Sequence, residues 1–365
     1  MMNKVRLVDI CNPKQWKTIP TSELLNAGYP VYGANGIIGY YGEYNHENPV
    51  VAITCRGATC GTINITEPKS YVTGNAMCLD DVREDIEQEY LYYCMLHYDF
   101  SKVISGSAQP QITRQGLNKV NVSICSREEQ MIIVQKLKKV EDIIKLRNTE
   151  LSLIDDLIKA RFVEMFGTLD NPVHDFEKAT LKELCNKITD GKHGGCTQDE
   201  GTERYFVGAR EIFDDIVHYD TAPEINVDEF EKDYKRCNVE IGDFLIVNTG
   251  ATIGKSAIAV DERTEHTLLQ KSVALLKVKR EKLNSVFLKW CYRVNTQMYL
   301  VESASAQPNL LLSKINSTVI YVPDIDMQNE FAQFVEQVDK SKSVVQKSLD
   351  EAQLLFDSLM QKYFG

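Results

Sequence analysis

The sequence predicts an α+β protein in which two mixed α/β domains alternate with two long helices. Two observations support this prediction. The chain repeats itself at a nearly constant offset, and each copy ends in a long segment with helical periodicity. The prediction therefore rests on the repeat, the strands and helices inside each copy, and the terminal helices.

The repeat extends over nearly the whole chain. Leu7 matches Leu181 at an offset of 174, whereas the match ending in Phe364-Gly365 has an offset of 198 from Phe166-Gly167. The intermediate matches are Gly57–Gly61 with Gly250–Gly254 and Ser107–Pro110 with Ser305–Pro308. Most of the extra residues of the second copy lie before its Gly-Ala-Thr loop. We expect them to be in loops, because loops tolerate insertions better than packed elements do. The two copies are expected to share a plan and to differ in their loops.

The sequence of each copy predicts several strands, then a short helix and then a long helix. Runs of β-branched and apolar residues before and after the Gly-Ala-Thr loop predict strands, and the apolar spacing further on predicts a helix. The expected strands are 49–55, 62–66, 244–248 and 256–260, and the expected short helices are 89–98 and 286–294.

The long helices are expected at 127–166 and 325–364. Ser126 and Glu129 have capping-box spacing, and Asp324 stands at the matching N-cap position. Apolar side chains recur at alternating intervals of four and three residues from Ile133 and again from Phe331, a pattern that favours an antiparallel coiled coil between the two helices and a pseudo-two-fold internal repeat. Each helix would span roughly 60 Å. The alternative is two independent amphipathic helices, each packed on its own domain.

Composition places limits on function. The chain has 365 residues, 43% of them hydrophobic, and a formal net charge of −11, so a DNA-binding face would have to be locally positive. No stretch is apolar enough for a membrane span, and the ten cysteines form no CxxC pair, which favours reduced thiols and a cytoplasmic protein.

Two segments resemble a nucleotide-binding or a metal-binding motif, but neither has the full spacing or ligand set. Gly250–Ser256 is one residue too short between its glycines for a phosphate-binding P-loop, so a turn is expected there. His193 and Cys196 lack a second ligand pair nearby in sequence. Neither a catalytic site, a metal site nor a cofactor is therefore expected.

Several phrases, in this order and at this offset, resemble the specificity subunits of type I restriction-modification systems. They are Tyr32–Tyr40, Cys55–Thr59, Gly74–Met77 and the Ser-Ala-Gln-Pro segment of both copies. The resemblance covers nearly the entire chain. Each phrase alone is weak, whereas the ordered and repeated set is specific.

The resemblance implies two target-recognition domains, each followed by a long helix. The first domain is 1–125 and its helix is 126–167. A linker and the second domain occupy 168–323, and the second helix is 324–365. Each domain would read one half of a bipartite, asymmetric double-stranded DNA site, and the paired helices would set the spacer and dock two methyltransferase subunits. Two motor-nuclease subunits would complete the complex, and all catalysis would belong to these partners. A scaffold or anti-restriction protein that does not read sequence is the alternative.

The expected DNA contacts are polar loop residues, because amides and guanidinium groups read base edges while lysine and hydroxyls hold phosphates. For Gln109 and Gln307, a structural role joining domain to helix is the alternative. In the first domain the candidates are Tyr32, Asn35, Arg56, Thr59, Ser107, Gln109 and Gln111; in the second they are Lys192, His193, Arg204, Arg210, Thr249, Thr252, Lys255 and Gln307.

Overall fold

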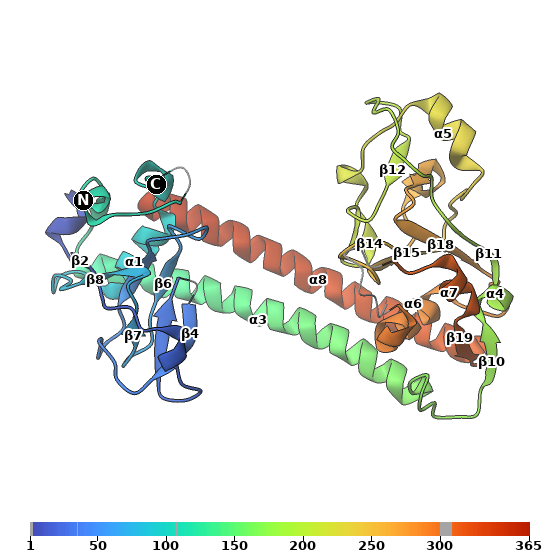
Figure 1. Ribbon diagram of the computed structural model, residues 1–365, viewed down its shortest axis with the longest axis horizontal. Coiled ribbons are helices and arrows are strands. Elements are labelled where there is room, and N and C mark those ends of the chain that lie inside the picture. Colours follow the sequence, from blue (N-terminus) through green and yellow to red (C-terminus); the bar gives the residue numbers. More distant parts are fainter. Residues whose placement is uncertain (1–2, 35, 107–108, 300–308) are drawn as a thin grey trace. The chain divides into compact units, whose positions relative to one another are not determined.

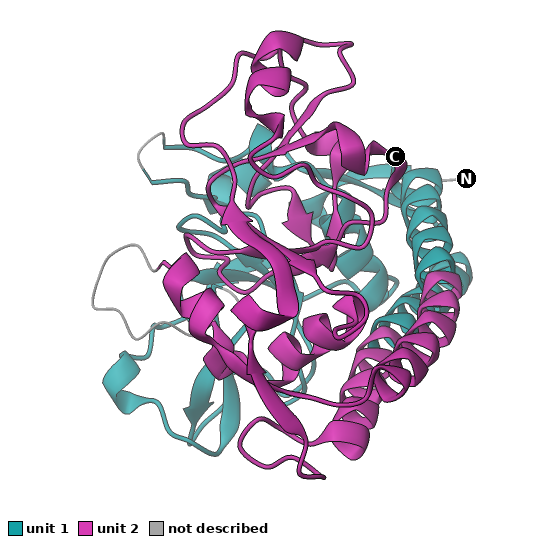
Figure 2. Ribbon diagram, turned by 90° about the vertical axis from the view of Figure 1, so that its right-hand side faces the viewer, with its two compact units in different colours: residues 1–149, 346–365 teal, residues 150–345 magenta. Residues whose placement is uncertain are grey.

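The computed structural model describes residues 3–34, 36–106, 109–299 and 309–365. The chain divides into two compact units, one made of residues 1–149 and 346–365, the other of residues 150–345 (Figure 2). Each unit combines strands and helices, in agreement with the α+β prediction. No helix in the described part of the chain is both long and apolar enough to cross a membrane.

The first unit contains a four-stranded antiparallel sheet of order β2-β8-β5-β6, a three-stranded sheet β4-β3-β7 and the pair β1-β9 (Figure 1). Its strands are β1 (Asn3–Arg6), β2 (Asn12–Gln15), β3 (Tyr29–Gly33), β4 (Gly36–Tyr41), β5 (Val51–Thr54), β6 (Ile63–Ile65), β7 (Tyr71–Val72), β8 (Ala76–Asp80) and β9 (Asn121–Ile124). Its shorter helices are α1 (Gln88–His97) and α2 (Arg114–Leu117). The core lies between the four-stranded sheet, α1 and the adjoining parts of the two long helices.

The second unit repeats the four-stranded sheet in the same order, β11-β18-β15-β16, and the strand pair as β10-β19. It also has a parallel pair, β12-β17, and a hairpin, β13-β14. Its strands are β10 (Glu177–Thr180), β11 (Cys185–Asp190), β12 (Tyr205–Val207), β13 (Ile212–Phe213), β14 (Ile216–Val217), β15 (Phe244–Val247), β16 (Ser256–Ile258), β17 (Thr267–Leu269), β18 (Val273–Val278) and β19 (Val319–Val322). Its shorter helices are α4 (Leu181–Leu184), α5 (Val227–Tyr234), α6 (Ser285–Val294) and α7 (Leu312–Ser317).

The two long helices are α3 (Arg127–Phe166) and α8 (Ile325–Phe364), which confirms both predicted helices. The capping box at the start of α3 is confirmed as well, because Ser126 Oγ accepts from the Glu129 amide while Glu129 accepts from the Ser126 amide, each at 3.3 Å.

Within each unit, a part of α3 runs antiparallel to a part of α8. In the first unit, Lys136 lies 3.5 Å from the Tyr363 hydroxyl and Arg147 donates to Ser348 at 3.1 Å. In the second unit, Lys342 pairs with Asp155 at 2.7 Å. None of the apolar seam positions expected from Ile133 and Phe331 is exposed.

A buried glutamine ties each long helix to its own unit. Gln130 accepts from the Glu87 amide at 2.8 Å and donates to the carbonyl oxygens of Asp85 and Cys125 at 3.0 and 2.9 Å. Gln328 makes the equivalent three bonds, accepting from the Asn284 amide at 2.9 Å and donating to Lys282 and Pro323 at 3.0 and 2.8 Å. Both side chains are fully buried, so each first helical turn is fixed to the segment before α1 or α6.

Candidate nucleic-acid interface

In the first unit, the turn that follows β5 is held against a segment more than fifty residues further along the chain. The Gly61 amide donates to Thr54 at 2.8 Å and the Thr62 amide to Thr59 at 3.0 Å, which closes the turn. The Ile112 amide donates to the Cys55 carbonyl at 3.0 Å, so the chain around Gln111 runs beside Arg56. Arg56 and Gln111 are exposed and Thr59 is half-buried, and all three therefore lie at one edge of the unit.

The second unit builds the same turn with equivalent bonds. The Gly254 amide donates to Val247 at 3.0 Å, and the Lys255 amide donates to Thr252 at 3.1 Å. The Leu310 amide donates to Asn248 at 2.7 Å, which aligns Thr249 with Asn309 as Arg56 is aligned with Gln111. The two turns are thus one backbone framework built twice.

Glycine is required at both ends of each turn. Gly57 and Gly61 have φ of +90° and +98°, and Gly250 and Gly254 have φ of +98° and +92°, a region that side-chain-bearing residues avoid. A Cβ on Gly254 would also lie 2.5 Å from the Tyr299 ring. The sequence phrase Gly-Ala-Thr-x-Gly therefore encodes a turn, as expected.

The side chains on this common framework differ between the units. Arg56 of the first turn corresponds to Thr249 of the second, and Thr62 corresponds to Lys255, whereas Thr59 and Thr252 are the same residue at the same position. Thr249 Oγ1 donates to the side-chain oxygens of Asn248 and Asn309, each at 3.3 Å. Identical scaffolds with different polar groups are suited to reading different surfaces.

Further candidates of the second unit border the same turn. The Asn248 amide donates to the Ser272 carbonyl at 2.9 Å, and Ser272 Oγ accepts from Ala209, the residue before Arg210, at 3.2 Å. The Lys271 amide donates to the Lys192 carbonyl at 2.9 Å, which brings His193 to this edge. Arg210 and His193 both have exposed side chains.

Three sequence candidates make contacts within their own unit, and a role for them in DNA binding stays a prediction. Tyr32 lies in β3 and not in a loop; it is 7% exposed, and its hydroxyl accepts from the Glu67 amide at 3.2 Å. Lys192 pairs with Asp233 at 2.8 Å and Glu229 at 3.4 Å, and the hydrogen bond to Asp233 raises the pKa of its ammonium. Arg204 packs its guanidinium over the Phe230 ring, 5.3 Å from the centroid.

Asn35, Ser107 and Gln307 lie outside the described residues. Gln109 is exposed and next to Pro110, whose carbonyl accepts from the Gly57 amide at 3.2 Å. Gln109 is therefore brought to the first turn together with Gln111, although its role as a base contact stays a prediction.

Three residues at these edges are not among the candidates expected from sequence. Asn75 is exposed, and its carbonyl accepts from the Cys55 amide at 3.0 Å; Lys271 is exposed and precedes the equivalent Ser272. Asn309 stands where the fixed offset of 198 predicts the counterpart of Gln111. That offset, applied residue by residue, was the signal that could have found Asn309.

The edges of the turns carry exposed cations within an acidic chain. Arg56 in the first unit, and Arg210, Lys255 and Lys271 in the second, are exposed, and their side chains form no ion pair with residues that the structure describes. The net charge of the whole chain is −11, so any positive potential at these edges is local. A locally positive edge is what binding to phosphates requires.

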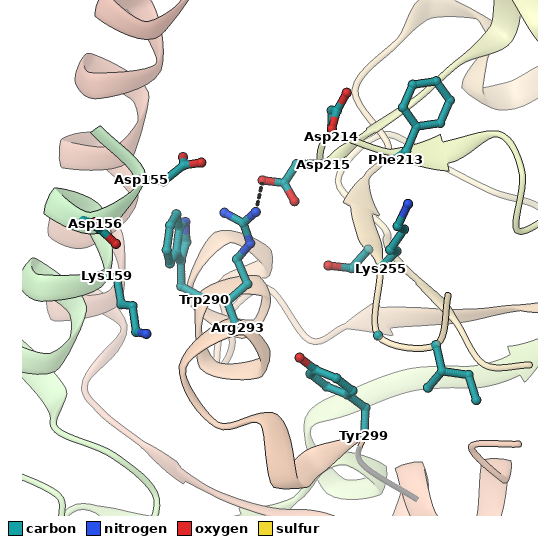
Figure 3. Close-up of a pocket in the computed structure, with 13 residues that line it drawn as sticks. Asp155, Asp156, Lys159, Phe213, Asp214, Asp215, Lys255, Trp290, Arg293 and Tyr299 are labelled. Atoms are coloured by element: carbon teal, nitrogen blue, oxygen red, sulfur yellow. Dashed lines mark ion pairs between the residues drawn. The ribbon is translucent and has the colours of Figure 1, made fainter. Parts of the chain in front are cut away.

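A cavity of about 510 Å³ opens beside Lys255 in the second unit (Figure 3). Asp215 pairs across it with Arg293 at 3.0 Å and with the nearby Lys289 at 3.1 Å, which ties the turn of the β13-β14 hairpin to α6. Burial lowers the pKa of Lys289, and the charge of Asp215 opposes this shift. Among the described lining residues, Asp215 and Arg293 form an ion pair that holds the hairpin turn on α6.

Comparisons with known proteins agree with this architecture. The model of the family described as type I restriction modification DNA specificity domain matches residues 1–155 and 174–353. The type I restriction enzyme EcoprrI specificity subunit of Escherichia coli is 28% identical over 113 residues, which is 31% of this chain and 28% of that relative.

Two solved structures share the fold. The S subunit of a type I restriction-modification system from M. genitalium superposes with a TM-score of 0.63 at 14% identity, covering 100% of this chain and 96% of the other. A chain from a study of complex assembly and conformational transition in the type I R-M system gives a TM-score of 0.57 at 16% identity, covering 99% and 97%. With the family model matching both halves, this chain belongs to the type I restriction-modification specificity subunits.

Proposed function

We propose that this chain selects the DNA site of a type I restriction-modification complex, and that each of its halves reads one half of a bipartite, asymmetric sequence. Residues 1–125 and 168–323 act as the two target-recognition domains. The observation that carries the proposal is the turn framework, which is bonded alike in both units but presents Arg56, Thr62 and Gln111 in one where Thr249, Lys255 and Asn309 stand in the other. Different half-sites follow from different side chains on one scaffold.

The residues that contact DNA in this proposal are the polar groups at these edges. Arg56 and Gln111 have the hydrogen-bonding geometry to read guanine and adenine edges in the major groove. Lys255, Arg210 and His193 are suited to phosphate contact, and Gln109, Thr59, Thr249 and Thr252 complete the two edges. Asn75, Lys271 and Asn309 join this set because of where their backbones lie.

The long helices have a different role in the proposal. Segments 126–167 and 324–365 pair as one antiparallel coiled coil, which relates the two domains by a pseudo-two-fold axis and sets the spacer between half-sites. The antiparallel contacts within each unit, together with the unbroken forty residues of α3 and α8, support this pairing. The helices dock two methyltransferase subunits, to which two motor-nuclease subunits attach.

Catalysis belongs to those partners. We expect the purified chain to show no methyltransferase, ATPase or endonuclease turnover and to need no cofactor of its own. Turnover by the pure chain that disappears in a Lys255→Ala variant would contradict this.

The decisive experiment exchanges one domain. The chain, with residues 5–125 replaced by the matching domain of a relative, is expressed with its methyltransferase, and methylated adenines are mapped across the genome. One half of the methylated motif should change while the other half and the spacer stay the same. The matched control exchanges residues 179–323, which should change the other half.

A scaffold that holds proteins without reading sequence predicts a different outcome. Methylation would then be absent or unrelated to either domain, and DNA affinity would be insensitive to sequence. A change in both halves after a single exchange would instead show that recognition is not modular.

A further inference from the structure

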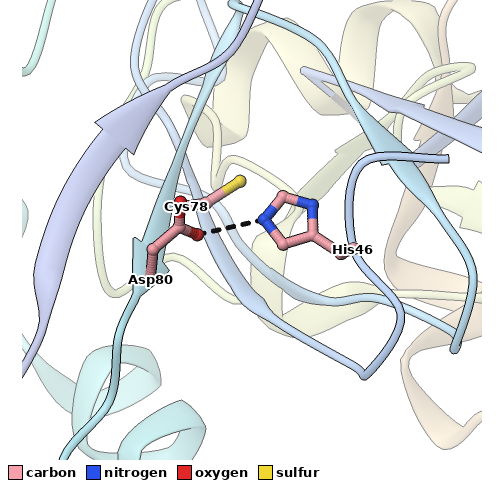
Figure 4. A group of neighbouring side chains, drawn as sticks. All are labelled: His46, Cys78 and Asp80. Carbon is pink, nitrogen blue, oxygen red and sulfur yellow. Dashed lines mark hydrogen bonds and ion pairs between the residues drawn. The ribbon is translucent and has the colours of Figure 1, made fainter.

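Three side chains that share no sequence motif meet in the first unit, away from the turn that follows β5. His46 lies in the connection between β4 and β5, and Cys78 and Asp80 lie on β8. Their ligand atoms are all within 4.8 Å of one another, and Figure 4 shows the carboxylate of Asp80 and the sulfur of Cys78 facing the imidazole. Because Cys78 and Asp80 are two apart on one strand, their side chains project from the same face.

The backbone and the ring of His46 are both held in place. The His46 amide donates to the Ser70 carbonyl at 3.1 Å, and the Ser70 amide donates back to His46 at 3.1 Å. The ring nitrogen Nδ1 lies 2.7 Å from Asn45 Oδ1. This arrangement directs the second ring nitrogen, Nε2, to a point 3.0 Å from Asp80 Oδ1.

The hydrogen bonds of Asn45 determine which ring nitrogen carries a proton. Asn45 Nδ2 donates to the Val72 carbonyl at 3.0 Å, and Asn45 Oδ1 accepts from the Val72 amide at 2.9 Å, so the side-chain amide cannot be turned over without losing both bonds. Oδ1 can only accept, and Nδ1 of His46 must therefore donate to it. The lone pair of the neutral ring is thus on Nε2, where it faces a carboxylate.

A neutral imidazole in this position leaves two acceptors opposed to each other. Nε2 and Asp80 Oδ1 repel unless a second proton or a cation lies between them. Asp80 is oriented as well, because the Trp16 indole donates to its other oxygen at 3.0 Å. Cys78 is fully buried in an apolar cluster with residues such as Val72 and Trp16, and its sulfur makes no hydrogen bond with any described residue.

We propose that His46 Nε2, Cys78 Sγ and Asp80 Oδ1 bind a divalent transition-metal ion of the Zn²⁺ class. One thiolate, one imidazole and one carboxylate are the donor set that such borderline-soft ions take. Metal-binding histidines nearly always donate their other ring nitrogen to an acceptor, as His46 does to Asn45. The two anionic ligands neutralise the charge of the ion, which makes the complex compatible with a largely buried site.

On binding, the sulfur–metal bond forms and the thiol proton is released to solvent. The ion would tie the segment around His46 to β8, and this inference does not depend on how the protein reads DNA.

The test uses the full-length chain, freed of metal by a chelator and titrated with Co²⁺. Binding should produce a thiolate-to-cobalt charge-transfer band that saturates at one ion per chain and is displaced by Zn²⁺. Cys78→Ala should lose the band. Cys94→Ala is the matched control, because Cys94 is also buried in this unit but packs in another cluster. Asn45→Ala keeps all three ligands and should weaken binding roughly 10–100-fold.

A second measurement does not depend on whether a variant folds. X-ray absorption of the Zn²⁺-loaded wild-type chain should show one sulfur together with nitrogen and oxygen neighbours. A shell with no sulfur or with several sulfurs, a charge-transfer band that survives in a folded Cys78→Ala chain, or no binding by the wild type would each overturn the proposal. His46 and Asp80 would then be a proton-bridged ion pair.

Discussion

Single side chains decide how each long helix is joined to its unit. Gln130 and Gln328 use the same three hydrogen bonds, to an amide and two carbonyl groups, at positions 198 residues apart. A buried amide that satisfies three backbone groups cannot be replaced by an apolar residue without leaving those groups unpaired. The glutamines therefore fix the direction in which each helix leaves its domain.

Replacing Gln130 by leucine should destabilise the first unit by about 2–3 kcal/mol, because buried backbone groups of Glu87, Asp85 and Cys125 lose their partner. The measurement is denaturant unfolding followed by Trp16 fluorescence in a Trp290→Phe background, which leaves the single tryptophan in this unit. Gln135→Leu, at an exposed position of the same helix, is the control and should change stability little. Equal effects of the two substitutions would contradict the role given to Gln130.

Lys255 tests the electrostatic part of the proposal. Its ammonium is exposed at the turn and forms no ion pair with a described residue, so the proposal assigns it to a phosphate. In the complex with the methyltransferase, Lys255→Ala should weaken binding to cognate and unrelated DNA alike, and should reduce the slope of log affinity against log salt by about 0.9. Lys182→Ala, exposed on α4, should leave the slope unchanged. A loss confined to the cognate sequence would assign base reading to Lys255 instead.

At the scale of elements, the turns after β5 and β15 depend on glycine for two separable reasons. Gly250 and Gly254 both have positive φ, but a Cβ on Gly250 would meet open space whereas one on Gly254 would meet the Tyr299 ring at 2.5 Å. Substituting Gly250 therefore measures the cost of the backbone conformation alone, and substituting Gly254 adds the cost of the steric clash with Tyr299.

Gly250→Ala should cost about 1–2 kcal/mol, which is the penalty for a left-handed conformation. Gly254→Ala should cost more, since the ring must also move. Both are measured by Trp290 fluorescence on unfolding in a Trp16→Phe background. If the two variants were equally stable, Tyr299 would not be packed against the turn as described.

The sequence predicts most of these elements because their signals are local. The start of α3 at Arg127 follows from a capping box, its length from apolar periodicity, and the turn at Gly57 from glycine spacing. What the sequence does not predict depends on pairing between distant segments. Lys192 pairs with acids of α5, and His46 meets Cys78 only because the chain folds back onto β8.

At the scale of the whole molecule, the proposal requires a fixed distance between the two target-recognition domains. α3 and α8 each take part in both units, since each is unbroken over forty residues while the unit boundary falls within it. A rigid helix pair would convert its own length into the spacer of the DNA site. The spacer is therefore the property that a change in helix length should alter.

Inserting seven residues into each helix, near Leu151 and near Leu349, keeps the heptad phase and so preserves the apolar seam. Each insertion adds about 10 Å of helix, or roughly three base pairs of B-DNA at about 3.4 Å per step. In cells that also carry the methyltransferase, mapped methylation should show a longer spacer between two unchanged half-sites. A three-residue insertion is the control: it rotates the seam, exposes residues such as Ile144, and should lower stability without giving a new spacer. An active seven-residue variant that methylates at the original spacing would mean that the helices hold the partner subunits but do not measure DNA.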